Sequence, residues 1–432
     1  MSERLIIRNF AGLDNIDIEL GRINIFIGPQ ASGKSVCAKC LYLFKSFIPT
    51  LFASIKSGQS KINFEDSYLI RFREYFPNLW RNDKDFILRY EAANIFVQIE
   101  SKDRKFEFTY SDIFITTAEN ARKEVEAFNT KSIRFPHSQD IFERLAWEPQ
   151  ALYNLRASFH YSNGNELEPL QRYVIAGRSF FTALKGSVLT FLANTPSSAI
   201  DPLLKDFIQQ YEIARRYQLI DGASDKKSFY NLTQQIIKGK LALNGDEDYV
   251  VNNDGRRVPL ANSSSGQQEV FPLLLMLLAL IPEEEDRYGP IDDESQVLYI
   301  EEPEAHLFPE SQQAIAYLMA AIYKQSPWHL QYIITTHSPY FLTSFNNLIY
   351  AHQLAERLHD QPTELKKLYK IVPKSQQVPL SDFRVYGLEN GKAISLIDYE
   401  LGLISASLLD SASDVTADQF GDLMALDPTT KP

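Results

Sequence analysis

The chain contains three short runs in which apolar residues follow one another with almost no polar interruption. They span residues 23–27, 297–300 and 332–335. A run that is apolar on both faces is typical of a strand buried in the middle of a sheet. Other segments have the apolar spacing of α-helices, among them residues 35–47, 267–280 and 312–325. This alternation predicts an α/β fold with a central, mostly parallel sheet.

Shorter strands joined by turn residues predict an antiparallel β lobe in addition. Residues 95–110 are expected to form one hairpin, and residues 249–260 a second one over an Asn-Asp-Gly turn. Residues 183–240 have the pattern of several helices, which predicts a helical insertion. In the last ninety residues we expect strands and a helix close to the end. The expected strands lie near residues 348–350, 368–371 and 384–386.

A glycine-rich motif follows the first buried strand and precedes a helix. It reads Gly28-Pro29-Gln30-Ala31-Ser32-Gly33-Lys34-Ser35, and it fits the pattern G-x-x-x-x-G-K-[ST] of phosphate-binding loops. In such a loop the main-chain N–H groups and the helix N-terminus, here including Val36, bind the phosphates of ATP. Lys34 would place a positive charge on the β- and γ-phosphates, and the Ser35 hydroxyl would bind Mg²⁺.

Two carboxylates end the second buried strand, in the order Glu301-Glu302-Pro303. Ligands of open α/β sheets bind outside the carboxyl ends of the strands, and adjacent residues there point at neighbouring positions. We assign Glu301 to the metal, directly or through water. We assign Glu302 as the general base that activates the attacking water. Without the phosphate-binding loop, a solvated acidic turn would be an equally good interpretation of the same pair.

Two further segments carry polar residues at the ends of predicted elements. Ser264, Ser265 and Gly266 stand before a helix, where they form an anion site as well as a helix cap. His337 ends the third buried strand, where its imidazole can hydrogen-bond a γ-phosphate or a catalytic water. A histidine in a sequence is more often structural, but this one follows a core strand as the acidic pair does.

Taken in order, the segments GPQASGKS, SSSGQQ, LYIEEPEAHLFP and IITTHSP resemble the ABC-type ATPase heads of the SMC, RecF and OLD group, and most of all the single-chain bacterial OLD-like AAA ATPases. The resemblance covers residues 3–35 and 249–351. Arg178 also follows a strand that looks like the Tyr-Ile-Pro-x-x-Arg segment of that group, which makes it a candidate nucleotide-site residue.

The resemblance implies that two heads enclose two ATP molecules. Lys34, Ser35, Glu301, Glu302 and His337 would act on the nucleotide of their own head. The Ser264-Ser265-Gly266 segment would reach the γ-phosphate of the opposite head. ATP and Mg²⁺ are the cofactors implied, and a homo-oligomer, either a dimer or a higher assembly, is the implied partner. Four regions are expected: an N-terminal ATPase lobe (1–110), a mixed or helical insertion (111–248), a C-terminal ATPase lobe (249–351) and an α/β extension (352–432).

The sequence also differs from the families that it resembles. Glu301 stands where ABC heads more often have Asp, and residues 340–432 contain neither the Glu-Gly strand end nor the Asp-x-Asp pattern of a Toprim nuclease. We therefore expect no nuclease centre in this chain. The segment between Arg178 and Ser263 is too short and too weakly heptadic for a long coiled coil.

Composition separates the candidate functions. The net charge of −11 disfavours a protein that coats nucleic acid or adsorbs to an anionic membrane. Nothing resembles a signal peptide, and the longest apolar run, residues 270–281, is too short to span a bilayer. We expect a cytoplasmic protein without a membrane partner. The prediction is an ATPase switch for a separate effector, a nuclease or toxin, in bacterial anti-phage defence. The alternative is a RecF- or SMC-like head that repairs or tethers DNA, and a transporter subunit is a third, weaker candidate.

Two other features have plainer interpretations. Cys37 and Cys40 could form a redox or metal pair, but core packing is favoured because no second pair or histidine is nearby. Arg71 and Arg73 stand among aromatic residues, as in proteins that bind single strands. An amphipathic helix with a solvated face is favoured there because acidic residues are interspersed.

Overall fold

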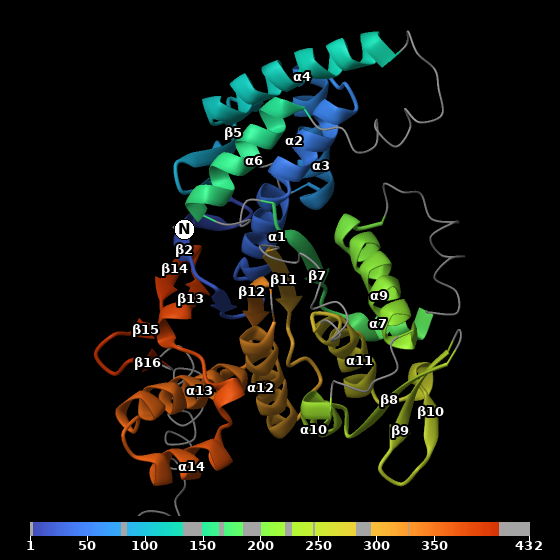
Figure 1. Cartoon of the computed structure of the whole chain (residues 1–432), viewed down its shortest axis with the longest axis vertical. Helices are drawn as coiled ribbons and strands as arrows, with labels where there is room; N and C mark the ends of the chain where they lie inside the picture. The colour runs from blue at the N-terminus through green and yellow to red at the C-terminus, as the bar shows by residue number, and fades with distance from the viewer. Residues whose placement is uncertain are drawn as a thin grey trace, which may run out of the picture.

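The computed structural model of the chain describes residues 3–78, 84–132, 149–163, 168–184, 200–220, 227–244, 247–281, 295–326 and 328–405. Within them, eleven strands form one sheet in the order β6-β5-β4-β1-β2-β14-β13-β3-β12-β11-β7. The sheet runs through the molecule with helices on both sides of it (Figure 1). The predicted α/β class is confirmed.

One half of the sheet is parallel. Its strands come from distant parts of the chain: β13 (Phe383–Glu389), β3 (Ile23–Ile27), β12 (His329–Thr336), β11 (Ser295–Glu301) and β7 (Leu170–Val174). Each pairs in parallel with its neighbour in that order. β3 and β11 are buried along their whole length, as the largely apolar sequence at their centres predicts.

The other half is antiparallel and local in sequence. It consists of β6 (Lys105–Tyr110), β5 (Ile95–Lys102), β4 (Phe86–Ala92), β1 (Glu3–Phe10) and β2 (Leu13–Leu20). β14 (Lys392–Ser395) joins the two halves, because it pairs antiparallel with β13 and parallel with β2. The predicted antiparallel lobe is therefore continuous with the central sheet.

A separate three-stranded sheet and a small hairpin complete the β structure. Their strands are β8 (Gly239–Asn244), β9 (Glu247–Asn252), β10 (Arg257–Pro259), β15 (Ile397–Asp398) and β16 (Leu403–Ile404). The β9–β10 hairpin turns at Gly255, whose φ of 86° lies in the left-handed region that glycine adopts readily. The predicted Asn-Asp-Gly turn is thus found.

The helices divide between the two faces of the sheet and the insertion. They are α1 (Lys34–Lys45), α2 (Phe47–Lys56), α3 (Lys61–Tyr75), α4 (Asp112–Ser132), α6 (Gln150–Asn163), α7 (Arg178–Leu184), α9 (Pro202–Ile220), α10 (Lys227–Ile237), α11 (Ser265–Leu278), α12 (Pro309–Gln325), α13 (Pro339–Arg357) and α14 (Pro362–Ile371). Successive side chains of a strand point to opposite faces, so each central strand contributes to two cores. Ile25 packs in the core with α11 to α13, whereas Phe26 packs in the core with α1 to α3.

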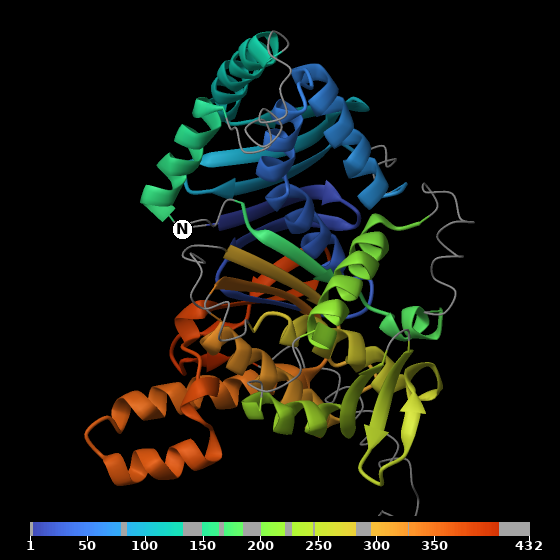
Figure 2. The ribbon, with the colours of Figure 1, turned by 45° about the vertical axis from the view of Figure 1, so that its right-hand side comes forward.

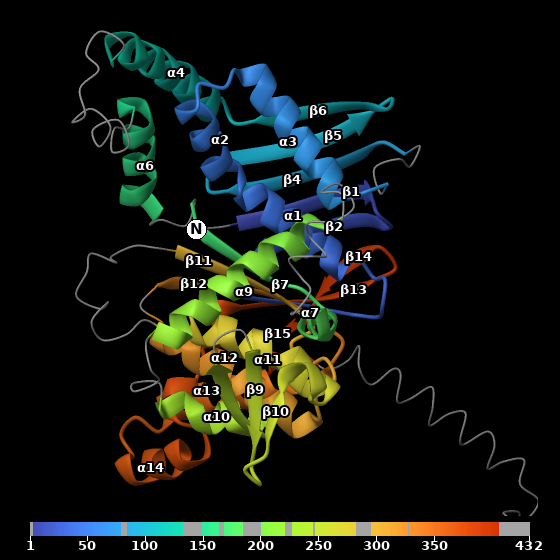
Figure 3. The same cartoon turned by 90° about the vertical axis from the view of Figure 1, so that its right-hand side faces the viewer.

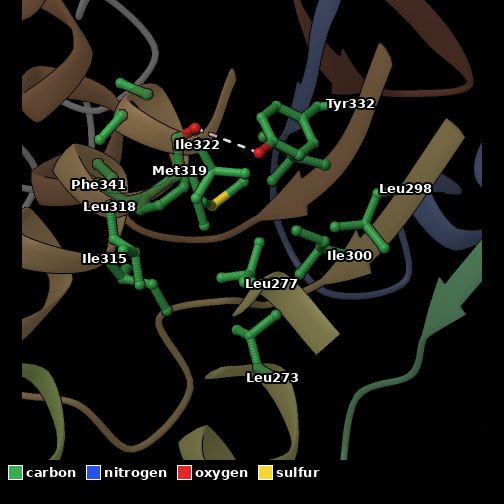
Figure 4. Close-up of a cluster of buried hydrophobic side chains, with 14 of the residues drawn as sticks. Leu273, Leu277, Leu298, Ile300, Ile315, Leu318, Met319, Ile322, Tyr332 and Phe341 are labelled. Atoms are coloured by element: carbon green, nitrogen blue, oxygen red, sulfur yellow. Dashed lines mark hydrogen bonds between the residues drawn. The ribbon is translucent and has the colours of Figure 1, made fainter. Parts of the chain in front are cut away.

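The core beneath the parallel strands is aliphatic. Leu298 and Ile300 of β11 face Leu277 of α11 and the apolar side of α12 (Figure 4). Tyr332 of β12 is fully buried, and its hydroxyl donates to the Met319 carbonyl oxygen at 3.2 Å. That hydrogen bond satisfies the polar end of a ring that otherwise lies among apolar side chains and beside the ring of Tyr323.

The core of the antiparallel half is aromatic. α3 lies across β4, β5 and β6 (Figure 3), and Tyr68 of this helix stacks on Phe108 of β6 with ring centroids 4.7 Å apart. Phe47, at the start of α2, contacts the rings of Phe64 and Tyr110. Many of the aromatic residues that the structure describes in the first third of the chain are therefore core residues of this lobe.

Two of the three strands predicted near the C-terminus are wrong. Residues 348–350 lie in α13 and residues 368–371 end α14, while residues 384–386 do lie in a strand, β13. Short apolar runs fit either element, and here the buried positions of α13 recur with helical spacing. The α13–α14 pair extends from the body of the chain (Figure 2). The helix expected close to the end lies outside the described residues.

One segment of the described residues is long and apolar enough to cross a membrane by length and composition, Lys34–Lys56. It consists of α1 and α2, and 72% of its most apolar stretch is buried inside the structure. Cys37 and Cys40 are among these buried residues, and burial raises the pKa of the Cys37 thiol to about 12. This supports core packing for both cysteines.

Candidate nucleotide site

The candidate site lies at the carboxyl edge of the parallel half, where three strands end together. Ile27 of β3 is paired with Thr336 of β12, and Thr335 is paired with Glu301 of β11. The residues that follow these strands therefore leave the sheet side by side. In this way the fold brings together the glycine-rich loop, the acidic pair and His337, which are far apart in the sequence.

The glycine-rich loop needs glycine at both of its ends. A Cβ on Gly28 would lie 2.3 Å from the Leu388 carbonyl oxygen of β13, and one on Gly33 would lie 2.3 Å from the Leu13 side chain. Gly33 also has a φ of 93° and caps α1 without a side-chain hydrogen bond. The first N–H groups of α1 thus keep no capping side chain, which is the arrangement that suits an anion.

The other residues of the loop differ in exposure. Pro29, Gln30, Ala31 and the Ser35 side chain are exposed, while Ser32 is partly buried. Ala31 has a φ of 59°, so the loop makes a tight turn there. Val36, in the first turn of α1, packs against the N-terminal core and holds the start of the helix in place.

Lys34 folds back over the loop that precedes it. Its Nζ donates to the carbonyl oxygens of Gly28 at 2.8 Å and Pro29 at 2.7 Å, and lies 3.5 Å from His337 Nδ1. Burial lowers the pKa of Lys34, and the nearby carboxylates of Glu302 and Glu304 oppose that shift. The ammonium group is therefore held at the point where the loop, the acidic pair and the histidine converge.

Glu301 is buried and fixed from the β7 side. Its Oε1 accepts from the Tyr173 hydroxyl at 2.9 Å and its Oε2 accepts from the Ala176 main-chain N–H at 3.2 Å. Each oxygen keeps a further lone pair, so the carboxylate can still bind a metal ion or its water. The described residues hold no group of three or more His, Cys, Asp or Glu side chains that could bind a metal. A donor set of one hydroxyl and one carboxylate fits Mg²⁺, which retains waters and takes phosphate oxygens as ligands.

Glu302 projects from a strained main chain towards His337. Its φ of 45° is in the left-handed region, which costs a residue with a side chain roughly 1–3 kcal/mol. Its Oε1 lies 3.3 Å from His337 Nε2, and both side chains are partly exposed. Lys34, His337 and Glu302 thus form a row of neighbouring polar groups at the edge of the sheet.

Glu304 has a role in the site that the sequence did not predict. Its Oε1 accepts from the Thr336 hydroxyl and from the His337 main-chain N–H, both at 2.7 Å. Its Oε2 is buried and has no hydrogen-bond partner among the described residues. Burial raises the pKa of this carboxyl group above its ordinary value. Glu304 therefore fixes the loop that carries His337.

The Ser264-Ser265-Gly266 segment forms the N-terminus of α11. Ser264 caps the helix in a reciprocal box with Gln267, in which Ser264 Oγ accepts from the Gln267 N–H at 3.4 Å and the Gln267 side chain accepts from the Ser264 N–H at 3.2 Å. Both serines are exposed. Among the described residues, no hydrogen bond or ion pair joins them to Lys34, Ser35 or Glu302.

Arg178 lies beneath the site instead of in it. The side chain is fully buried, and its guanidinium donates to the main-chain carbonyl oxygens of Ile175, Glu269, Glu301 and Glu302 at 2.8–2.9 Å. Burial lowers its pKa, which the surrounding carboxylates oppose. A guanidinium that is enclosed in this way cannot bind a phosphate, so the predicted contact of Arg178 with the nucleotide is corrected to a contact with the main chain that holds Glu302.

Comparison with known proteins places the chain in a family. The model of the AAA ATPase domain matches residues 1–342. No curated protein matches the sequence. Solved structures that are similar include the SMC head domain from Thermotoga maritima, with 13% identity, a TM-score of 0.36, and coverage of 91% of this chain and 97% of that one.

Two other solved structures are also similar to this chain. One is a Pyrococcus furiosus Smc head bound to the C-terminal domain of ScpA, and the other is the recombination mediator protein RecF. The Smc head has 13% identity and a TM-score of 0.36, and the match covers 96% of this chain and 98% of that one. RecF has 12% identity and a TM-score of 0.32, and the match covers 92% of this chain and 98% of that one.

Proposed function

The chain belongs to the AAA ATPase domain family, and we propose on that premise that it hydrolyses ATP with Mg²⁺ between two copies of itself and thereby switches a separate effector. The observation that carries the proposal is the convergence of Lys34, Glu302 and His337 at one edge of the sheet. An anti-phage nuclease or toxin is the effector that we favour.

Each residue has a distinct part in the proposed reaction. The main-chain N–H groups of the loop and the Lys34 ammonium bind the phosphates. Ser35 and Glu301 would hold Mg²⁺, which would supply positive charge to the phosphate oxygens. Glu302 accepts the proton of the attacking water, and its exposure of 39% leaves room for that water. The imidazole of His337, 3.3 Å from Glu302, donates a hydrogen bond to the γ-phosphate or orients the water.

The exposure of side chains around the site supports the proposal that a second copy of the chain binds there. Ser264 and Ser265 stand at the start of α11, are exposed and make no hydrogen bond to Lys34 of their own chain. The N–H and hydroxyl of Ser264 are engaged by Gln267, so Ser265 is the exposed polar residue that this helix start offers to another molecule. Large aromatic side chains are exposed on the segments that surround the site: Phe308 is 79% exposed, Phe180 60% and Tyr340 59%. Exposed apolar side chains beside polar site residues are typical of a surface that another protein covers.

The choice between an effector switch and a DNA-binding head rests on charge. A net charge of −11 disfavours the phosphate contacts that dominate DNA affinity. Binding of labelled duplex DNA, measured with and without ATP at several salt concentrations, would decide this point. ATP-dependent binding with a steep salt dependence would favour the DNA-tethering alternative, and co-purification with a nuclease or toxin encoded nearby would favour the switch.

The two-copy site can be tested with Ser265→Arg. We expect this variant to keep ATP-induced thermal stabilisation but to lose both hydrolysis and the ATP-dependent dimer that we expect light scattering to detect for the wild type. Lys34→Ala should lose the stabilisation as well, because it removes the charge on the phosphates. Ser57→Arg, an exposed serine at the end of α2, is the matched control. Normal hydrolysis by Ser265→Arg would overturn the two-copy site.

A further inference from the structure

A buried ion pair connects the serine segment to the catalytic turn. Arg178 Nε lies 3.3 Å from Glu269 Oε2, and both side chains are almost completely buried, at 0% and 2% exposure. Glu269 belongs to α11, five residues after Ser264. At a rise of about 1.5 Å per residue, the pair lies roughly 8 Å along the helix from the exposed serine.

Arg178 makes two separate sets of contacts. On one side its guanidinium donates to the carbonyl oxygens of Glu301 at 2.8 Å and Glu302 at 2.9 Å. On the other side its Nε donates to the Glu269 carbonyl oxygen at 2.8 Å. A planar guanidinium presents its donors in fixed directions, so these contacts set the position of α11 relative to the strained turn at Glu302.

Glu269 is satisfied completely by the segment that carries Arg178. Its carboxylate accepts from the main-chain N–H groups of Arg178 at 2.9 Å and Ser179 at 3.0 Å, and from the Ser179 hydroxyl at 2.7 Å. A buried carboxylate with this many hydrogen bonds is held in one position. The start of α7 and the second turn of α11 are thus fixed to each other.

A second contact joins α11 directly to the loop that follows Glu302. A Cβ on Gly266 would lie 2.7 Å from the carbonyl oxygen of His306, in the loop that follows Glu302. The glycine therefore allows the first turn of α11 to pack directly on that loop. His306 itself has a φ of 58°, so this loop is also held in a sparsely populated conformation.

We infer that Arg178 and Glu269 are positioning residues that couple the two nucleotide sites of the assembly. The inference rests on the proposed function, in which Ser264 and Ser265 contact the nucleotide of the other copy. The pair then makes the geometry of Glu302 in one site depend on whether the serines of the same chain have engaged the nucleotide in the other. Such coupling gives positive cooperativity of hydrolysis in ATP.

The coupling can be separated from simple support of the fold. Arg178→Lys keeps a positive charge but cannot span the four carbonyl oxygens. Glu269→Gln keeps the shape but places a donor NH2 group against the main-chain N–H of either Arg178 or Ser179. For each variant we expect kcat to fall about 10- to 100-fold, a KM within about 3-fold of the wild type, and a Hill coefficient that falls from above 1 to 1. The double variant should be no worse than the more impaired single variant, because the two residues act as one unit.

The matched control is a buried ion pair elsewhere in the chain. Arg215 Nε lies 2.7 Å from Asp248 Oδ1, between α9 and β9. Arg215→Lys should lower the Tm without changing the Hill coefficient. The inference is overturned if Arg178→Lys and Glu269→Gln lower only the Tm and keep the wild-type kcat and Hill coefficient. A wild-type protein that does not hydrolyse ATP would instead count against the proposed function.

Discussion

The two halves of the eleven-stranded sheet are built in opposite ways. The antiparallel strands β1, β2, β4, β5 and β6 all come from residues 3–110, and neighbours in the sequence are mostly neighbours in space. The parallel strands come from residues 23 to 389 and meet only in the folded chain. The first half therefore consists mainly of local hairpins, whereas the second brings the ends of distant segments to one edge.

The chemistry follows this difference. In the antiparallel half, main-chain conformations with positive φ occur at hairpin turns, such as Ala93 and Asp103. In the parallel half they occur at Glu302 and His306, where the candidate site is formed. A residue with a side chain requires surrounding contacts to keep this conformation, and Arg178 supplies one of them for Glu302. The antiparallel half thus mainly stabilises the molecule, whereas the parallel half holds the site residues in conformations that cost some stability.

The strongest test of this division is Glu302→Gln. The amide keeps the size of the side chain but cannot accept the proton of the attacking water. We expect kcat to fall by about 10²- to 10⁴-fold, while ATP still binds and the ATP-dependent dimer accumulates. Phosphate release assays and light scattering would measure the two effects. Hydrolysis at the normal rate would show that another group is the base.

The opposite result is expected in the antiparallel half for Phe47→Ala. Phe47 is fully buried and contacts the rings of Phe64, Tyr68 and Tyr110. Its truncation leaves a cavity in the aromatic core and should cost about 3–5 kcal/mol of unfolding free energy.

In that variant the ATP affinity of the folded fraction should stay within about 3-fold of the wild type, because the site lies on the other half. Denaturant titration and nucleotide binding would measure both quantities. Ile62→Ala, an exposed residue of the same lobe at 69% exposure, is the control and should have almost no effect. A large loss of ATP affinity in Phe47→Ala would show that the halves are not independent.

In the parallel half, the sequence predicts the site motifs well but does not predict the order of the strands in the sheet. A short apolar run alone fits either a strand or a helix, but the three buried strands are recognisable because each run leads directly into the polar residues of a candidate site. The position of β13 between β14 and β3 could not be predicted. It depends on pairing between residues more than 350 positions apart in the sequence, for which local patterns carry no information.

The contacts that support the site could not be predicted from the sequence either. Arg178 binds main-chain carbonyl oxygens, which every residue possesses, so no partner could be recognised from sequence. Glu304 was visible as a third acidic residue, but its contacts with Thr336 and the His337 N–H arise only when β11 and β12 pair. Residues 348–350 lie within α13 and not in the predicted strand, because a three-residue apolar run has no period that distinguishes a strand from a helix.

The smallest expected effect is that of a substitution at Glu304. It tests whether the buried carboxyl group of the candidate site lowers the stability of the parallel half. Burial raises the pKa of this carboxyl in the folded state, so the native protein retains the proton over a pH range in which the unfolded chain has lost it. Its contribution to stability is therefore fully present below the ordinary glutamate pKa of about 4.3. It is lost as the pH rises through the folded-state pKa.

Glu304→Gln removes this titration while its side-chain carbonyl can still accept from Thr336 and the His337 N–H. Relative to the wild type, the variant should be more stable at pH 8, by on the order of 1 kcal/mol, and equally stable near pH 4. Thermal unfolding across that pH range would measure the difference, with the exposed Glu400→Gln as control. Parallel stability curves for the wild type and Glu304→Gln would mean that Glu304 is ionised in the folded state at no cost. The main-chain strain at Glu302 would then be the stability cost that remains at the site.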